Sequence, residues 1–596
     1  MSSAPAGPGG AAAGAGPGGG GSSAPSREQN SGVPGAPAEP ADAAAYLDLL
    51  LADASLGMLR RFLPGRSMAR FGLGLARSPG TVARRVAGLA GDLGSIAAGR
   101  SALAPPARDR RFADPAWTAN PVLRRLVQAY LAAGAFALAL VDDADLGWRD
   151  AQRVGFVVRN LVEAAAPSNN PLVSPEAWKA VIETGGLSVP RGLRALASDM
   201  AAPPRVPSMV PADAFEVGRD LAVSPGAVVR RTEICELIHY TPATDQVNQY
   251  PVLIVPPTIN KYYITDLAPG RSMIEYLVAQ GHQVFVISWR NPDARHYDWG
   301  LDAYGQAVVD SLDAARAICG TTKASVCALC SGGIIASMVA AHLRDAGRLD
   351  QLASLFLGVT VLDQGQDGTV AALADSRTAA LAVAASKSRG YLDGRSLAEV
   401  FAWLRANDLI WSYWVNNYLR AQQPPPFDIL YWNADTTRMP AALHRDFIGV
   451  ILGSALAKGS ASMLGSPVDL SAVDVDAYVL AGAADHLCPW QSCYRSARLL
   501  GGDTRFVLST SGHIASMVNP PSNVKARFQV ASEPLAGLPG PDDWLRAAHT
   551  AAGSWWPDYS SWLAERGGGT KEAPAELGAD GFPVLDPAPG RYVFDR

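Results

Sequence analysis

The feature that most constrains this fold is a cysteine between an apolar run and a helical pattern. Cys330 follows the apolar residues 324–329 and precedes Gly332, Gly333 and a helix-like stretch at 333–346. Residues without a Cβ suit a sharp turn where a strand and a helix crowd together. The segment therefore predicts a strand, a tight turn that exposes the Cys330 side chain, and a helix.

Short apolar runs alternate with helical stretches beyond residue 228, as in a parallel sheet with crossover helices. Strands are predicted at 251–255, 283–288, 324–329, 354–361, 476–480 and 504–508, and helices at 303–318 and 333–346. A nucleophile on the turn after a strand is typical of the α/β-hydrolase fold. We therefore predict an α/β protein: an α/β-hydrolase catalytic domain with a helical cap insertion, preceded by a mostly helical N-terminal domain.

Composition and periodicity divide the chain into three parts. Residues 1–43 are almost wholly Gly, Ala, Pro and Ser and bury too little apolar surface to become ordered, so a disordered tail is expected. Helical spacing marks an N-terminal domain at 44–226. The catalytic domain is assigned to 227–596, with an aromatic-rich cap or lid inserted at about 363–475.

The composition argues against several classes of function. A net charge of −4 gives no bulk field that would draw the chain to nucleic acid. Six cysteines in 596 residues do not form a disulfide framework, which favours a reducing compartment. No basic segment leads into an apolar one after Met1, and the apolar stretch 129–141 is shorter than the ~20 residues that span a bilayer. We expect a cytoplasmic protein without a transmembrane segment.

Three residues with catalytic chemistry each follow a predicted strand, in the order nucleophile, acid, base: Cys330, Asp485 and His513. Parallel strands bring their carboxyl ends to one edge of a sheet, so these side chains can converge. α/β-Hydrolases use the same chain order. An isolated Cys is usually a small buried hydrophobe, and Ala328 stands where the usual pattern has Gly, so the prediction of a triad depends on the three occurring together.

Acid–base chemistry gives each member a role. A free thiol has a pKa of ~8.5, so a neighbouring histidine must take its proton at neutral pH. We expect His513 to activate Cys330 and Asp485 to hold the His513 tautomer. A thiolate holds an acyl group as a thioester, which can still drive ester formation, so sulfur favours acyl transfer over hydrolysis. The oxyanion hole is expected from the backbone N–H groups of Ser331, Thr258 and Ile259.

Metal or redox chemistry is the competing interpretation of the cysteines. Cys327 and Cys330 form a Cys-x-x-Cys pair, and Cys488 and Cys493 lie downstream, so four thiols could hold zinc. However, the downstream spacing is loose and no turn signals of a zinc knuckle surround it. Cys327 also falls inside a predicted strand, where its side chain alternates away from the turn. We predict no metal site.

Six segments in order along the chain carry distinctive patterns. They are VPPTINKYYITDL at 255–267, SWRNPD at 288–293, the Cys330 box, YWNADTT at 431–437, SGHI and NPP within 511–521, and PAPGRYV at 587–593. Together they resemble the signature of polyhydroxyalkanoate synthases, and the likeness runs from about Phe112 to the C-terminus. In that family the matching Cys, Asp and His form the catalytic triad, which agrees with Cys330, Asp485 and His513.

The resemblance implies polymerisation of (R)-3-hydroxyacyl-CoA into polyhydroxyalkanoate polyester, with release of CoA. Cys330 would carry the growing chain as a thioester, His513 would activate the thiol, and Asp485 would help to deprotonate the 3-hydroxyl of the incoming unit. No cofactor is needed, because CoA arrives with the substrate. The expected partners are the acyl-CoA, the polyester and the granule surface, and the N-terminal region is expected to serve homodimer contacts or granule binding.

Chain-length preference and two other functions stay open. The sequence of segment 427–432 resembles that of enzymes that polymerise medium-chain units, whereas Ala515 is the residue typical of enzymes for short-chain units. We favour a single-subunit enzyme that uses short-chain units. The alternative enzyme is a Cys-dependent thioesterase or lactone hydrolase of the same fold. The alternative without catalysis is a granule-associated protein with an inactive Cys330 box.

Overall fold

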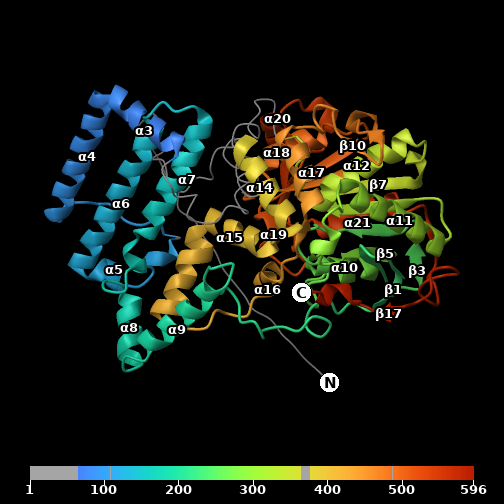
Figure 1. Cartoon of the computed structure of the whole chain (residues 1–596), viewed down its shortest axis with the longest axis horizontal. Coiled ribbons are helices and arrows are strands. Elements are labelled where there is room, and N and C mark those ends of the chain that lie inside the picture. Colours follow the sequence, from blue (N-terminus) through green and yellow to red (C-terminus); the bar gives the residue numbers. More distant parts are fainter. Residues whose placement is uncertain (1–64, 108, 364–375, 486) are drawn as a thin grey trace, which may run out of the picture. The chain divides into compact units, whose positions relative to one another are not determined.

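The computed structural model describes residues 65–596 apart from 108, 364–375 and 486. The tail predicted at 1–43 lies outside the described residues, and so do residues 364–375 of the predicted cap. The described chain runs from a helical region into a large sheet that a helical insertion interrupts (Figure 1). The boundaries that we drew between the three parts remain predictions.

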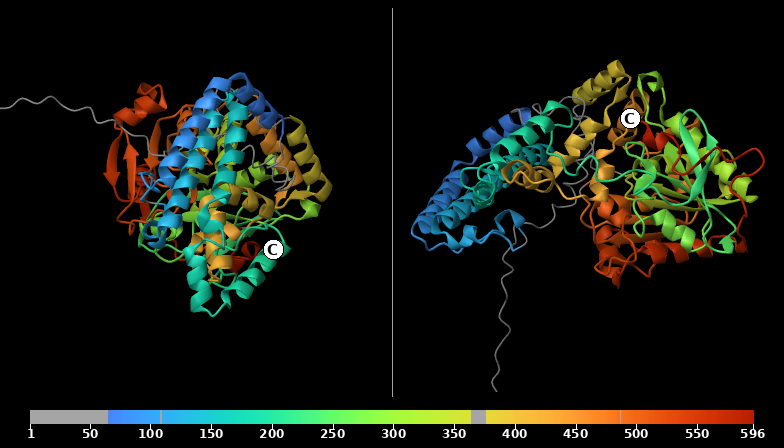
Figure 2. Two further views of the ribbon diagram at one scale, coloured as in Figure 1. Left: turned by 90° about the vertical axis from the view of Figure 1, so that its left-hand side faces the viewer. Right: turned by 90° about the horizontal axis from the view of Figure 1, so that it is seen from below.

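Long helices form the described part of the chain before the sheet. They are α3 (Arg66–Arg77), α4 (Pro79–Ala97), α6 (Pro121–Asp142), α7 (Trp148–Ala164), α8 (Pro175–Glu183) and α9 (Ser188–Ala201). Helix α6 contacts both α4 and α7, and these helices run alongside one another in Figure 2. Asn120 caps α6 by accepting hydrogen bonds from the N–H groups of Val122 and Leu123, and Pro121 fills the first position, where its missing N–H is not needed.

Helix α6 is longer than the apolar stretch 129–141 from which we judged membrane insertion. Polar residues that favour helices extend it toward Asn120, so it reaches 22 residues. By length and composition it is the one described helix that could cross a membrane, with a mean hydropathy of 1.3 and 28% of its most apolar window buried. Part of its apolar surface packs against α4 and α7.

One sheet of eleven strands organises the rest of the chain. In spatial order the strands are β15 (His549–Ala552), β14 (Arg527–Val530), β13 (Thr504–Ser509), β12 (Ala477–Gly482), β7 (Leu352–Gly358), β6 (Ala324–Leu329), β4 (Val252–Val255), β5 (Val284–Trp289), β2 (Cys235–Tyr240), β1 (Gly226–Arg231) and β17 (Asp586–Pro587). The six strands from β13 to β5 pair in parallel, and the strands at both edges are antiparallel. These six are the strands predicted from the apolar runs.

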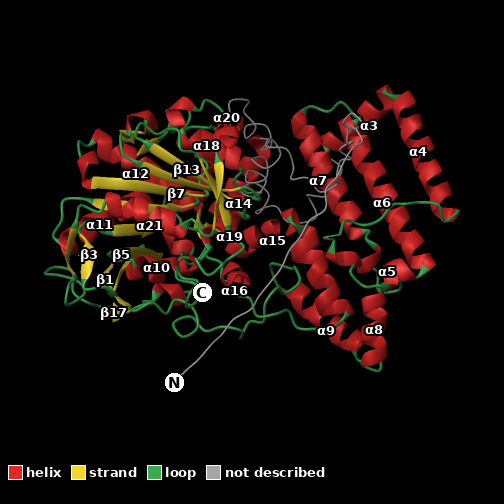
Figure 3. Ribbon diagram, turned by 180° about the vertical axis from the view of Figure 1, so that it is seen from behind, coloured by secondary structure: helices red, strands yellow, loops and turns green. Residues whose placement is uncertain are grey.

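Burial on both faces explains why apolar runs located the parallel strands. Every residue of β4, β5 and β6 is buried, and such strands are nearly continuous apolar stretches rather than alternating ones. Helices flank the sheet (Figure 3), among them α11 (Leu301–Cys319) and α12 (Ser331–Asp345), which pack together, and α10 (Met273–Ala279) and α21 (Trp556–Glu565).

The insertion between β7 and β12 is helical, as predicted for the cap. Its helices include α14 (Ser376–Arg389), α15 (Gly394–Leu404), α16 (Asp428–Ala434) and α17 (Ala441–Leu452), with two π-helical turns at Asn407–Trp411 and Trp414–Leu419. The side chains of Trp403, Trp411, Trp414 and Tyr418 contact one another edge to face. Trp414 Nε1 and Tyr418 OH also donate hydrogen bonds to residues before the sheet, so part of this aromatic cluster is structural.

Candidate active site

Cys330 occupies the turn between β6 and α12 in a strained backbone conformation. Its φ is 49° and its ψ is −118°, values that a residue with a Cβ adopts only where the surroundings fix them. Cys330 N donates to Gly358 O at 2.9 Å, and Cys330 O accepts from Gly333 N at 2.9 Å. The end of β7 and the first turn of α12 therefore hold the turn that carries the thiol.

The two glycines after this turn are required by close packing. A Cβ on Gly332 would lie 2.5 Å from the carbonyl oxygens of Val255 and Pro256. A Cβ on Gly333 would lie 2.0 Å from Thr360 Oγ1. Gly332 therefore lets α12 start against the backbone at the end of β4, and Gly333 leaves room for the Thr360 side chain after β7.

Asp485 and His513 come from the loops after β12 and β13, which are neighbouring parallel strands. The pairing of Gly482 with Ser509 brings the ends of the two strands level. His513 Nδ1 lies 2.7 Å from Asp485 Oδ2. Asp485 Oδ1 accepts hydrogen bonds from Leu487 N at 2.8 Å and from Cys488 N at 2.9 Å. The buried carboxylate is thus fully bonded, and it fixes the imidazole ring.

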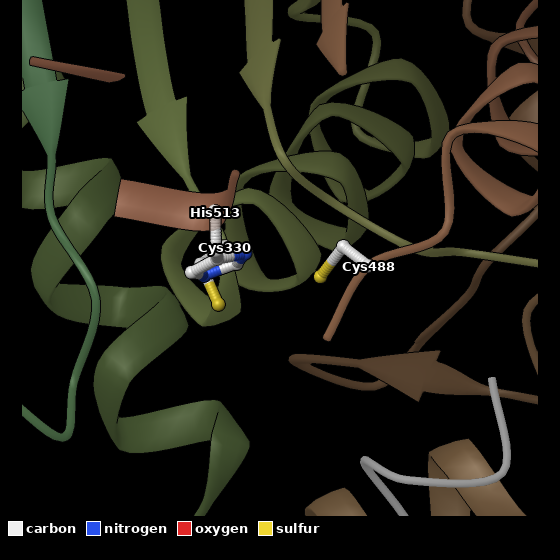
Figure 4. A group of neighbouring side chains, drawn as sticks. All are labelled: Cys330, Cys488 and His513. Atoms are coloured by element: carbon white, nitrogen blue, oxygen red, sulfur yellow. The ribbon is translucent and has the colours of Figure 1, made fainter. Parts of the chain in front are cut away.

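The structure brings Cys330 and His513 together and adds Cys488, a residue that the sequence analysis left out of the predicted triad. Cys330 Sγ, Cys488 Sγ and a ring nitrogen of His513 all lie within 4.8 Å of one another (Figure 4). We had considered Cys488 only as a zinc ligand. The one signal in the sequence was its position three residues after the predicted acid Asp485. In the structure, the bond from Cys488 N to Asp485 Oδ1 holds it beside the site.

The site favours a thiolate beside an imidazolium. A hydrogen bond with Cys488 lowers the pKa of the Cys330 thiol well below its ordinary value, against the effect of burial, and His513 lowers it further. Burial opposes a charge on His513, but the Asp485 carboxylate and the Cys330 sulfur together outweigh it and raise the pKa of His513 to about 10. The pKa of Cys488 is raised by its hydrogen bond with Cys330 and by burial, so Cys488 stays protonated.

The expected oxyanion donors lie on two adjacent segments, where the Ser331 N–H faces the Cys330 sulfur and the Thr258 N–H is bonded to a side chain. Thr258 N donates to Ser331 Oγ at 3.0 Å, and the two hydroxyl oxygens of these residues lie 3.3 Å apart. The N–H of Ser331 follows the nucleophile directly, at the start of α12. Thr258 N–H can therefore bind an oxyanion only if the Ser331 hydroxyl turns away.

The cap is tied to the segment that carries Thr258 and Ile259. Thr437 N donates to Ile259 O at 3.1 Å, and Thr437 Oγ1 donates to Thr258 O at 3.1 Å. Trp432 Nε1 donates to Lys261 O at 2.7 Å. Two of the distinctive sequence segments, at 255–267 and 431–437, thus pack against each other and join the cap to the edge of the active site.

Comparison with known proteins places the chain in a family. A model described as the N-terminus of poly-beta-hydroxybutyrate polymerase (PhaC) matches residues 108–277, and a model of the alpha/beta hydrolase fold matches 251–520. The chain is 45% identical over 522 residues to poly(3-hydroxyalkanoate) polymerase 1 of Ectopseudomonas oleovorans, covering 87% of this chain and 92% of that one. It belongs to the poly(3-hydroxyalkanoate) polymerase family. A further relative is the poly(3-hydroxyalkanoate) polymerase subunit PhaC of Cupriavidus necator, 38% identical over 84% of this chain and 85% of the relative.

Family membership confirms three of the predictions from the sequence. The resemblance to polyhydroxyalkanoate synthases, the α/β-hydrolase fold class and the assignment as a transferase all agree with these relatives. The family model at 108–277 begins close to Phe112, where the likeness was judged to start. The individual roles of Cys330, Asp485 and His513 are not tested by these comparisons and remain predictions.

The thiolate–imidazolium pair makes a prediction about alkylation. Cys330 should react with iodoacetamide at half its maximal rate at a pH well below the ~8.5 of a free thiol, because the lowered pKa of Cys330 keeps the thiolate populated. Reactivity should be lost only as the pH falls through that lowered pKa. The measurement is the mass of the peptide that carries Cys330, sampled over time from about pH 5 to about pH 9.

Two variants control this experiment. Cys330→Ala should abolish the fast-reacting site, because the other five cysteines are buried. His513→Gln should move the midpoint upward, because it removes the neighbouring positive charge. A wild-type midpoint at the value of free cysteine, unchanged in His513→Gln, would contradict the ion pair.

Proposed function

We propose that this chain polymerises (R)-3-hydroxyacyl-CoA into polyhydroxyalkanoate through a covalent thioester on Cys330. The observation that carries the proposal is the row of carboxylate, imidazole and thiolate formed by Asp485, His513 and Cys330. It lies at the turn after β6 in a chain 45% identical to a protein named poly(3-hydroxyalkanoate) polymerase 1. Such a row is the arrangement that activates a nucleophile for acyl transfer.

The reaction divides into two acyl transfers. Cys330 Sγ attacks the thioester carbonyl, the bond to the CoA sulfur breaks, and the CoA thiolate takes a proton from His513. The acyl group stays on Cys330. The 3-hydroxyl of the next unit then attacks this thioester, its proton passes to His513, and Cys330 leaves as a thiolate. An oxygen ester forms from a thioester in each cycle, which runs downhill.

Asp485 acts through His513 in this scheme. Both of its carboxylate oxygens are bonded, one to His513 Nδ1 and the other to the N–H groups of Leu487 and Cys488. A carboxylate held in this way stabilises the imidazolium, and its existing bonds favour that role over the deprotonation of the 3-hydroxyl that the resemblance implied for Asp485. We therefore assign deprotonation of the 3-hydroxyl to His513, with Asp485 as the residue that positions it.

Water must be kept from the acyl-enzyme for a polymer to form. The hydrogen bonds from Thr437 and Trp432 attach the cap to the segment that carries Thr258, beside Cys330. A cap held there would shield the thioester and favour attack by a hydroxyl of the growing chain over hydrolysis. No cofactor takes part in this scheme, and we propose that the enzyme works in the cytoplasm at the surface of polyester granules.

A product assay separates this proposal from the thioesterase and from the protein without catalysis. Incubation with (R)-3-hydroxybutyryl-CoA should release CoA and give an insoluble polyester in equivalent amounts, and Cys330→Ala should abolish both. CoA release that yields only free hydroxy acid would favour a thioesterase. Unchanged CoA release from Cys330→Ala would contradict the covalent mechanism. The same assay with hydroxyacyl thioesters from short to medium chain length would then test the length preference.

The engaged Thr258 N–H makes a separate prediction. Ser331→Ala should keep turnover at or above the wild-type rate, because it frees that N–H for the oxyanion. Thr258→Val is the matched control, since it keeps the backbone N–H and removes only the side-chain hydroxyl. A fall of ~10²–10³ in kcat for Ser331→Ala, the usual effect of losing an oxyanion donor, would instead make the Ser331 hydroxyl the donor.

A further inference from the structure

Cys488 gives the site around Cys330 more thiol chemistry than acyl transfer needs. Its Sγ, Cys330 Sγ and a ring nitrogen of His513 lie within 4.8 Å of one another. In Figure 4 the three side chains come from different segments, and the Cys488 sulfur points toward Cys330 and His513. Over the described ranges of the chain, no other group of three such side chains meets this distance. These three side chains could therefore bind a ligand, such as a metal ion, in addition to catalysing acyl transfer.

The donor atoms match the preferences of one metal. Two cysteine sulfurs and one histidine nitrogen form a ligand set that Zn²⁺ takes in proteins, with Zn–S near 2.3 Å and Zn–N near 2.0–2.1 Å. Atoms bound to one tetrahedral ion at those lengths lie roughly 3.5–3.8 Å apart. Side-chain movements of about 1 Å would bring Cys330, Cys488 and His513 from their 4.8 Å limit to that spacing.

The surrounding hydrogen bonds already have the form that supports a bound zinc ion. Histidine ligands usually donate their second N–H to a carboxylate, which fixes the ring and strengthens the metal bond. His513 Nδ1 is bonded to Asp485 Oδ2, which leaves Nε2 as the coordinating atom. The other oxygen of Asp485 accepts from Cys488 N. One buried carboxylate thus positions two of the three ligands.

We propose that Cys330, Cys488 and His513 bind one Zn²⁺ ion and that the bound ion reversibly blocks the nucleophile. Coordination would use a lone pair on each sulfur and on His513 Nε2, and any proton still held by these groups would pass to solvent. No electron is transferred. Three protein ligands leave a fourth position for water. In the metal-bound state the Cys330 sulfur is no longer free to attack a thioester, so the enzyme would be held inactive until the ion leaves.

The metal site and the proposed function can fail separately. Binding depends only on the three side chains and Asp485, whereas inhibition also rests on the proposed role of Cys330. The test therefore needs a readout that does not use polymerisation. Co²⁺ provides it, because tetrahedral cobalt bound to thiolates absorbs in the visible and near ultraviolet.

The experiment uses the full-length protein freed of metal and kept in buffer without thiols or chelators. Equilibrium dialysis against Zn²⁺ should give one ion bound per chain, and Co²⁺ should give thiolate charge-transfer bands that Zn²⁺ abolishes. Cys488→Ala should weaken Zn²⁺ binding by ~10–100-fold or more, because removing even a group that supports a metal ligand has an effect of that size. The matched control is Cys493→Ala, which removes a neighbouring buried thiol outside the cluster and should bind Zn²⁺ like the wild type.

Activity gives the second readout. Zn²⁺ should inhibit CoA release by the wild type and by Cys493→Ala, and chelation should restore the activity. To lose half of its own uninhibited rate, Cys488→Ala should need a Zn²⁺ concentration at least tenfold higher than the wild type does. Equal Zn²⁺ affinity in Cys488→Ala and Cys493→Ala would overturn the proposal, as would a wild-type protein that retains no ion. Cobalt bands that depend on Cys488, in a protein without polymerase activity, would leave the metal site standing and count against the proposed function.

Discussion

The hydrogen bond between His513 and the buried Asp485 carboxylate is the interaction on which the site depends. A carboxylate without solvent is costly unless it is fully bonded, and Asp485 accepts from two backbone N–H groups as well as pairing with His513. The bond fixes the ring, and against the effect of burial the Asp485 carboxylate and the Cys330 sulfur raise the pKa of His513 to about 10. The resulting positive charge on His513 is one of the influences that hold Cys330 as a thiolate, and the Cys488 thiol supplies another.

The sheet brings these residues together although they lie far apart in the sequence. Strands β6, β7, β12 and β13 are successive parallel neighbours, so the loops that carry Cys330, Asp485 and His513 leave the sheet at one edge. The rigid strands also sustain the strained backbone of Cys330, since β7 supplies the oxygen that accepts its N–H. Gly332 allows α12 to begin against the end of β4, and Gly333 leaves room for Thr360 after β7. Sheet geometry and local strain together define where the thiol lies.

The sequence predicts those parts of the molecule that leave a periodic or ordered signal. Apolar runs located the six parallel strands because their residues are buried on both faces, and the order of Cys330, Asp485 and His513 located the residues that the structure brings together. Contacts between segments without such a signal could not be predicted. The meeting of Cys488 with Cys330 depends on how the loop after β12 folds around Asp485, and the bond from Thr258 N to Ser331 Oγ depends on two loops meeting. The apolar stretch 129–141 is shorter than α6 because apolar residues alone do not mark where a capped helix begins.

The central claim is that the growing polyester is bound covalently to Cys330. The most direct measurement is the mass of the peptide containing Cys330 after rapid mixing with (R)-3-hydroxybutyryl-CoA and acid quenching. The account predicts that this peptide gains hydroxybutyryl units before free polymer appears, and that His513→Gln slows the gain by ~10² or more. CoA released at the wild-type rate while the Cys330 peptide stays unmodified, or acyl units found on another residue, would contradict it.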